Sequence, residues 1–522
     1  MIILQADELY FNLMKNLYFL IASNYLLHIS FCFGQAGTID STFGTNGATT
    51  SFYHAEHLIV QPNDKILIVG GTVNNFGLCR FNSDGKVDNS FGKNGRANGA
   101  TDPDAAVGCS GIALQDDGRI IVSSSSQVNW GQFVIARYTS NGELDESFGT
   151  NGFSKTDLWG DYSSQQLVVQ SDGKIIAGGD LKINNIKSGF GLVRYNQNGN
   201  LDNSFGTGGK VITGFSMIWT DFMSLTIQPD GKILAIGNLF DSTSSYKVCA
   251  VARYNSDGSL DNSFGSLGKL ELFSNAGLHQ SQITSVISQS DYKILIGGYY
   301  WSIPDADTHA MIIRLNPDGS LDNSFGTEGM VREDFDKIHA SGNEFNDIFL
   351  QSDNKIVGVG YSHYNSSDPY YFTMARFNSN GTLDSTFANN GMFLDSLFSN
   401  QATDIAIQST NKILVTNEYV VYRFLSGFDL ETLDLSKDSY LIYPNPVHLQ
   451  AILKYILAQD EKLNIELFDV QGKLMQIFMT DEIRPQGNHT EVLHFDQSLT
   501  SGTYILNIGN GKNKQVMKII IE

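Results

Sequence analysis

The sequence predicts an all-β protein, a seven-bladed β-propeller followed by a small C-terminal β-sandwich. A phrase with the fullest form Leu-Asp-Asn-Ser-Phe-Gly recurs along most of the chain at a period of about 60 residues. Two other landmarks keep step with it, and the repeat region has no long helical periodicity. Radial repetition of four-stranded units leaves only short, protected sheet edges, so these observations favour a propeller.

Each landmark occurs seven times. The aspartate of the phrase stands at Asp40, Asp88, Asp145, Asp202, Asp261, Asp322 and Asp384. A Gln-x-x-x-Lys/Arg phrase ends at Lys65, Arg119, Lys174, Lys232, Lys293, Lys355 and Lys412. An arginine accompanies them at Arg80, Arg137, Arg194, Arg253, Arg314, Arg376 and Arg423. Seven copies of one supersecondary unit follow from this count.

The fourth copy illustrates the strands of a unit. Residues 222–228 and 232–236 are apolar or alternating runs on either side of a Pro-Asp-Gly turn, which predicts a hairpin. Residues 248–254 and 260–265 flank an Asp-Gly turn and predict a second hairpin in the same sheet. Four strands per unit are therefore expected.

The order of the landmarks predicts a closed ring. Asp40 precedes any complete unit, whereas the last unit runs through Gln408, Lys412 and Arg423 and then lacks the phrase. The two ends complement each other. We expect residues 38–47 to supply the outer strand of the seventh blade, which would clasp the ends of the propeller together.

The arginine and the aspartate of a unit are eight residues apart, with a hairpin turn between them. This spacing suits cross-strand partners, so we predict a charge-assisted pair in every blade. The seventh pair, Arg423 with Asp40, would form across the closure. Because every unit carries the pair, we interpret it as structural rather than as a set of catalytic carboxylates.

The turns also resemble the later part of calcium loops. Asn255-x-Asp257-Gly258-x-x-Asp261 places oxygen ligands around a glycine, as such loops do. In the second unit the equivalent positions are Thr139 and Asn141, which lack charge. Asp-Gly and Asn-Gly are equally what a hairpin turn requires. No cofactor or metal is predicted, and calcium stays the alternative.

The N-terminal 35 residues do not fit the repeat. Met14-Lys15 opens an apolar stretch that ends before Gln35, the layout of a secretory signal peptide, and Met14 is an alternative start. A transmembrane anchor is the rival interpretation, but Asn24 and His28 interrupt the apolar run. We expect cleavage of residues 1–35, export, and no membrane span afterwards.

Composition excludes several partners and chemistries. The formal net charge of −21 disfavours nucleic acid, because phosphate binding requires basic patches. Cys79, Cys109 and Cys249 are an odd number in different repeats, so we expect small buried hydrophobes rather than disulfides. The chain has no motif for a metal centre, a nucleophile or a phosphate-binding loop.

After Arg423 the repeat stops. Residues 427–439 are acidic and serine-bearing, and we interpret them as a linker between the propeller at 36–426 and a domain at 440–522. That domain contains several alternating runs separated by glycine-bearing turns. About 80 residues of such strands suit a small β-sandwich.

The C-terminal region carries a distinctive set of residues, Tyr443, Pro444, Asn445, Pro446, Gly472, Lys473, Gly502, Tyr504 and Lys518. With them, about residues 440–522 resemble the type A C-terminal sorting domain of the type IX (Por) secretion system of Bacteroidetes. The resemblance implies that the type IX translocon is a partner, and that the chain passes through the periplasm to be secreted or attached at the outer-membrane surface.

The upstream units similarly resemble delta-60 repeats, over about residues 38–425. That family consists of propeller-like repeats without a common activity. The resemblance therefore implies the fold rather than the function.

A binding site must break the symmetry of the blades, so the variable segments are the informative ones. Those between the second and third strands and those between units fall on one face, which we call the variable face; the Asp-Gly turns fall on the opposite, turn face. All four tryptophans lie in variable segments. The candidate ligand-binding residues are Trp130, Trp159, Trp219, Trp301, Tyr300, His309, Tyr364 and Tyr371. Aromatic platforms suit a glycan or a protein ligand, whereas the alternative is packing of the loops against the rim.

The sequence thus predicts an exported, non-catalytic binding module whose ligand is a glycan or a surface protein. One alternative is a secreted hydrolase or lyase that uses loop carboxylates such as Asp305 with Asp307, or Asp161 with Asp221. Another is a structural surface protein without a ligand. Weaker binding on mutation of Trp301 and Trp130 would distinguish the first from the last.

Overall fold

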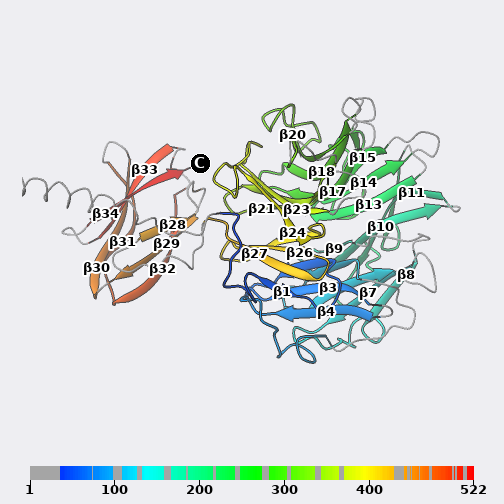
Figure 1. Ribbon diagram of the computed structural model, residues 1–522, viewed down its shortest axis with the longest axis horizontal. Coiled ribbons are helices and arrows are strands. Elements are labelled where there is room, and N and C mark those ends of the chain that lie inside the picture. The colour runs from blue at the N-terminus through cyan, green and yellow to red at the C-terminus, as the bar shows by residue number, and fades with distance from the viewer. Residues whose placement is uncertain are drawn as a thin grey trace, which may run out of the picture. The chain divides into compact units, whose positions relative to one another are not determined.

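The chain forms two compact units, one made almost entirely of residues before 430 and the other of residues after it. The computed structural model describes residues 36–72, 75–97, 109–125, 132–157, 166–183, 186–215, 219–240, 247–272, 281–302, 307–335, 342–363, 370–427, 440–443, 447, 450–457, 459–469, 473–496, 499, 502–509 and 514–521. The predicted signal peptide and nearly all of the predicted linker lie outside these residues. Within them, every named element is a β-strand (Figure 1).

In the compact unit before residue 430, antiparallel strands form seven repeat units in six hydrogen-bonded sheets, because units five and six share one sheet. Unit one has β2 His57–Val60, β3 Ile66–Thr72 and β4 Asn75–Phe81. Unit two has β5 Gly111–Leu114, β6 Ile120–Ser125, β7 Gln132–Tyr138 and β8 Phe153–Asp157. Unit three has β9 Gln166–Val169, β10 Ile175–Ile183, β11 Ile186–Tyr195 and β12 Lys210–Gly214. Unit four has β13 Trp219–Ile227, β14 Ile233–Phe240, β15 Lys247–Tyr254 and β16 Lys269–Leu272.

The remaining units complete the ring. Unit five has β17 Gln282–Ser288, β18 Ile294–Ser302, β19 Asp307–Leu315 and β20 Met330–Glu333. Unit six has β21 Gly342–Leu350, β22 Ile356–His363, β23 Tyr371–Phe377 and β24 Met392–Ser399, and a single bridge joins it to unit five. Unit seven has β25 Asp404–Ile407, β26 Ile413–Asn417, β27 Val420–Phe424 and the N-terminal β1 Ala48–Thr50. Six of the innermost strands contact one another in the order β25, β2, β5, β9, β13 and β17, and the contact of β25 with β2 joins the chain ends.

The middle strands of each unit are apolar because both of their faces are covered by neighbouring units. In unit four, every residue of β14 except Phe240 and every residue of β15 except Lys247 is buried. Side chains from these strands share one core with β17, β18 and β19 of the next unit. The cores therefore lie between blades, and each blade depends on its neighbours.

The recurring aspartate phrase forms a turn, so the prediction that residues 260–265 are the fourth strand is wrong. Only Leu260 pairs, in a single bridge with Tyr254, and the outer strand is β16, which follows the phrase. The Asp261 carboxylate accepts hydrogen bonds from the backbone N and the hydroxyl of Ser263, at 3.0 and 2.7 Å. Such local bonds compete with a strand ladder and fix a turn instead.

The chain ends meet in unit seven. Thr49 and Thr50 of β1 pair with Val421 and Val420 of β27, so blue β1 lies beside yellow β27 in Figure 1. The outer strand is Ala48–Thr50 rather than residues 38–47, because here too the aspartate phrase turns. Residues 37–40 nevertheless bond to residues 423–425 of the C-terminal end, with Leu425 N donating to Thr38 O at 2.9 Å. The ring is therefore closed by both ends of the repeat region.

The compact unit after residue 430 is a sandwich of two sheets around one core. One sheet orders β28 Tyr440–Tyr443, β29 Gln450–Leu457 and β32 Gly487–His494. The other orders β31 Leu474–Arg484, β30 Glu461–Asp469, β33 Gly502–Gly509 and β34 Lys514–Ile521. Leu453 from the first sheet and Leu467 and Leu506 from the second are fully buried in the shared core. The predicted β-sandwich is confirmed.

Two further sequence features can be compared with the structure. Cys79, Cys109 and Cys249 are buried thiols without disulfide partners. None of the described residues forms a helix with the length and apolar character that a membrane crossing requires.

Candidate functional site

The arginine and the aspartate of the repeat form an ion pair in all seven units, including Arg423 with Asp40 across the closure. The Nε–Oδ2 distances are 2.7 to 2.9 Å. Each guanidinium also lies over the ring of the phenylalanine in the phrase, 4.4 to 4.7 Å from its centroid. It donates a further hydrogen bond to a backbone carbonyl of the following unit. These residues connect each blade to the next.

The electrostatics of the aspartates agree with this role. Burial alone would raise the pKa of the Asp261 carboxyl, but the hydrogen bonds from Ser263 and the charge of Arg253 outweigh it and lower the pKa to about 2. Lys232 adds a second cation at 3.3 Å from the carboxylate. The group is therefore held ionised and cannot exchange protons near neutral pH.

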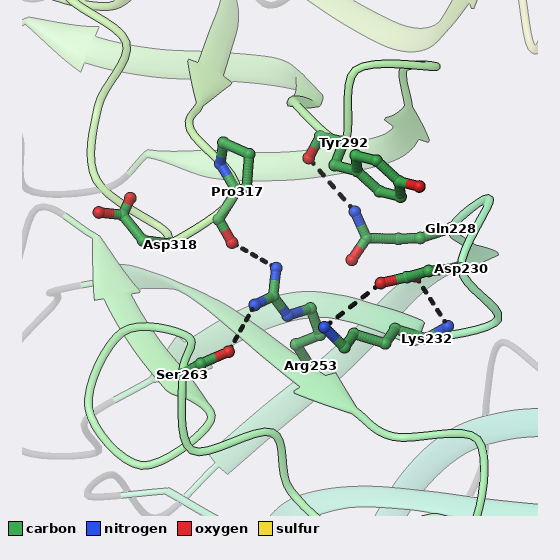
Figure 2. A pocket seen from close by; sticks show the side chains of 8 residues that line it. All are labelled: Gln228, Asp230, Lys232, Arg253, Ser263, Tyr292, Pro317 and Asp318. Atoms are coloured by element: carbon green, nitrogen blue, oxygen red, sulfur yellow. Dashed lines mark hydrogen bonds and ion pairs between the residues drawn. The ribbon is translucent and has the colours of Figure 1, made fainter.

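A pocket of about 370 Å³ lies between units four and five on the turn face (Figure 2). Its lining residues come from the repeated phrases and bond to one another. Arg253 donates to the Pro317 carbonyl, Gln228 Nε2 donates to the Tyr292 carbonyl at 3.3 Å, and Lys232 pairs with Asp230 at 3.3 Å. The pocket therefore lies at a seam between two copies of the repeat.

The positions that resemble calcium ligands bond within their own turns. Asp257 Oδ1 accepts from the backbone N and the hydroxyl of Ser259, at 2.9 and 2.7 Å, and Asn255 Nδ2 donates to the same hydroxyl. In the described part of the chain, no three His, Cys, Asp or Glu side chains converge in a way that could hold a metal ion.

The predicted aromatic residues that the structure describes differ in their exposure to solvent. Trp130, Trp159 and Tyr364 lie outside the described residues, as do the alternative carboxylates Asp161 and Asp305. Trp219 begins β13 and is 39% exposed, while Trp301 on β18 and Tyr371 on β23 are half-buried. Open aromatic surface on the variable face thus includes Trp219, with Trp301 and Tyr371 contributing partly.

Tyr300 and His309 are buried instead. Their rings stack across the β18–β19 hairpin at 4.8 Å between centroids. His309 Nδ1 contacts an Asp334 carboxylate oxygen, and the Arg332 guanidinium covers the Tyr300 ring at 4.9 Å. These two predicted residues therefore pack the base of a loop.

The variable face also contains a cluster of polar and aromatic residues that were not among the candidate ligand-binding residues. Six residues after the lysine of the Gln-x-x-x-Lys phrase, units three and four carry Asp180 and Asn238, which bond to the innermost strand of the next unit. Units five and six carry Tyr299 and Tyr361 at the same position. The replacement of Asp or Asn by Tyr at this position is visible in the sequence when the units are aligned on the repeated lysine.

Other side chains connect the blades where the tyrosines stand. Thr284 Oγ1 donates to the Phe345 carbonyl at 2.9 Å between units five and six, and Asn346 Nδ2 donates to the Ala402 carbonyl at 2.7 Å between units six and seven. Tyr299 and Tyr361 instead interact with Gln282 and Glu344.

Both tyrosines adjoin Glu344, near the start of β21 on the variable face. Burial raises the pKa of the Glu344 carboxyl to about 7, against the opposing effects of a hydrogen bond from Tyr361 and the charge of Lys247. Burial and the nearby Glu344 charge raise the pKa of Tyr299 above its usual range. We call Tyr299, Glu344, Tyr361, His363 and Tyr370 the aromatic–acid cluster.

A second group of titratable residues lies on innermost strands at the closure of the ring. Asp404 accepts hydrogen bonds from the backbone N of Leu58 at 2.8 Å and approaches His57 Nδ1 at 3.2 Å. Burial next to Asp404 raises the pKa of the Asp347 carboxyl well above its usual value. Asp347 also accepts from the backbone N of Ile405 at 3.3 Å, so the two acids connect units six, seven and one.

Two family profiles match the chain. The secretion system C-terminal sorting domain matches residues 441–522. A β-propeller domain of unknown function, DUF5122, matches six repeats at residues 61–91, 115–148, 170–205, 228–264, 289–325 and 351–387. The seventh unit is the one whose halves come from opposite ends of the chain, which explains why a contiguous repeat pattern does not cover it.

Among solved structures, the surface component PorZ of the type IX secretion system of Porphyromonas gingivalis is 11% identical with a TM-score of 0.37. That similarity covers 90% of this chain, which spans 59% of the length of PorZ. The WD40 propeller domain of Doa1 is 10% identical, with a TM-score of 0.40 and coverage of 72% and 97% of the two chains. The polysaccharide lyase Uly1 is 11% identical, with a TM-score of 0.42 and coverage of 75% and 92%. No curated protein matches the chain.

Proposed function

We propose that this chain, an exported β-propeller with a type IX secretion sorting domain at its C-terminus, is a non-catalytic module that binds a glycan through its variable face. The sorting domain directs the protein to the cell surface or the medium. The propeller is the part of the chain available to act there.

The observation that carries the proposal is the way in which units four to six depart from the repeat. Residues that recur in every unit form structural contacts within and between blades, as the arginine–aspartate ion pairs do. The variable face of units four to six instead presents Trp219, Trp301 and Tyr370, of which Trp219 is 39% and Tyr370 44% exposed. Aromatic rings with polar neighbours are surfaces on which sugar rings stack.

Catalysis by loop carboxylates remains the second candidate, and it has less support. Asp307 accepts a hydrogen bond from its neighbour Thr308 N at 2.8 Å, and Asp221 lies near the Lys247 ammonium. Each of these carboxylates would have to act with a partner across the site to cleave a glycosidic bond. Turnover of a glycan that binds would favour this candidate over a binding module.

The test is a screen of glycans against the full-length chain, followed by affinity measurements on single variants. Trp219→Ala and Trp301→Ala should each weaken binding of a glycan hit by about tenfold, because a stacked ring contributes about 1 kcal/mol or more. Tyr292→Gly is the matched control. Tyr292 is 41% exposed on the turn face, and its φ of 66° favours glycine, so this variant should fold and bind normally. If Trp219→Ala and Trp301→Ala bind the glycan as tightly as Tyr292→Gly does, the proposal is wrong.

A further inference from the structure

We propose that Glu344, together with the rings of Tyr361 and Tyr370, binds a primary ammonium group, and that the glycan ligand therefore carries unacetylated amino sugars. This inference rests on the proposed function and names the chemical class of its ligand. It also assigns a position for the charged group within the variable face.

Three strands of two neighbouring units build the site. Glu344 is near the start of β21, the innermost strand of unit six, and accepts a hydrogen bond from the Tyr361 hydroxyl on β22 of the same unit. Tyr299, on β18 of unit five, is close enough for the Glu344 charge to raise its pKa, and it bonds to Gln282. Glu344 is half-buried.

The charge nearest to this carboxylate in the described part of the chain is that of Lys247, which is not in direct contact with it. Among the described residues, no lysine, arginine or histidine nitrogen lies within 4.0 Å of a Glu344 oxygen, and the charge of Lys247 acts on it from farther away. Burying a carboxylate without a paired charge is unfavourable, which is why its pKa is raised. A cation on the ligand would supply the missing partner.

Three aromatic rings cluster together, and one of them belongs to Tyr361, the tyrosine that bonds to this carboxylate. The rings of Tyr361 and Tyr370 meet edge to face with centroids 4.7 Å apart, and His363 contacts them at 6.0 and 5.7 Å. Tyr370 is 44% exposed, whereas Tyr361 is partly buried and adjoins Glu344. The group of rings therefore reaches from the protein surface to the carboxylate. Aromatic faces attract ammonium groups, and a carboxylate behind them completes a site for such a cation.

A glycan is the better source of this group than a lysine side chain. Trp219 and Trp301 lie on the same face in units four and five and offer platforms for further sugar rings of a chain. Net charge of −21 on the protein also favours the approach of a cationic polymer.

The experiment compares ligands that differ only in the amino group. Calorimetry of the full-length chain at neutral pH would use a glucosamine hexamer, its fully N-acetylated counterpart and a lysine-containing peptide. We expect the glucosamine hexamer to bind at least tenfold more tightly than the acetylated one. Glu344→Gln and Tyr370→Ala should each reduce that affinity at least tenfold, while the exposed turn-face variant Glu328→Gln leaves it unchanged.

The outcomes separate this inference from the proposed function. Tight binding of both hexamers that survives Glu344→Gln would overturn the ammonium site but leave a glycan-binding face. Binding of the peptide alone, lost in Glu344→Gln, would overturn the choice of a glycan. Because Tyr370 is at the surface, Tyr370→Ala tests the site even if Glu344→Gln fails to fold, as judged by circular dichroism.

Discussion

At the scale of single residues, the repeated arginine connects three parts of the fold at once. Arg376 is 1% exposed and pairs with Asp384 at 2.8 Å. Its guanidinium lies 4.6 Å from the Phe387 ring centroid and donates to the Ser426 carbonyl in the next unit at 2.5 Å. One side chain therefore fixes the turn that holds the aspartate, covers a buried ring and connects two blades.

We predict that Arg376→Ala lowers the free energy of unfolding by about 3–5 kcal/mol, the usual effect of leaving a buried charge unpaired. Chemical denaturation followed by tryptophan fluorescence measures the difference. Lys86→Ala is the control, because Lys86 pairs with Asp84 at the surface and should leave stability unchanged. Equal stability of both variants would show that the buried pair contributes little.

At the scale of elements, the sequence predicts the number and order of strands better than their exact positions. Seven copies of each landmark specify seven units, and the eight-residue spacing leads to the observed Arg423–Asp40 contact across the chain ends. The outer strand is misplaced because a Leu-Asp-Asn-Ser-Phe run is compatible with a strand by alternation. The Asp–Ser hydrogen bonds that turn it are local chemistry that alternation does not reveal.

The site shows the same limit. Tyr299 and Tyr300 are adjacent on β18, and successive side chains of a strand point to opposite faces. Tyr299 adjoins Glu344, whereas Tyr300 stacks on His309 and is buried. Aromatic content of a variable segment therefore predicts the region of a site, and only the register tells which of two neighbours belongs to it.

The N-terminal clasp is the element whose loss should matter most. Removing residues 36–50 takes away β1, the fully buried Phe43 and the Asp40 partner of Arg423. We expect a chain that starts at Ser51 to be roughly 5 kcal/mol or more less stable than one that starts at Ala36, from the lost ring and the unpaired arginine. Thermal unfolding and protease resistance of the two chains measure this. A chain from Ser51 with unchanged melting temperature would show that the ring closes without its clasp.

At the scale of the whole molecule, the sorting domain has the means to fold on its own. Its two sheets enclose a core drawn only from residues between Ile442 and Ile521. The propeller in turn closes its ring with its own two ends, through β1 and β27. The export signal and the proposed ligand-binding face therefore lie in separate parts of the chain.

This separation predicts that removal of the sorting domain abolishes export but leaves the stability and the affinity of the propeller unchanged. A chain ending at Gly427 should lose surface display and secretion in a bacterium with a type IX secretion system, because it lacks the matched sorting domain. The same chain should keep the melting temperature of the propeller and its affinity for the ligand, because the clasp and the variable face are intact. Cell fractionation and calorimetry measure the two properties. Secretion of the truncated chain would place the export signal elsewhere, and loss of its affinity would show that the binding surface extends beyond the propeller.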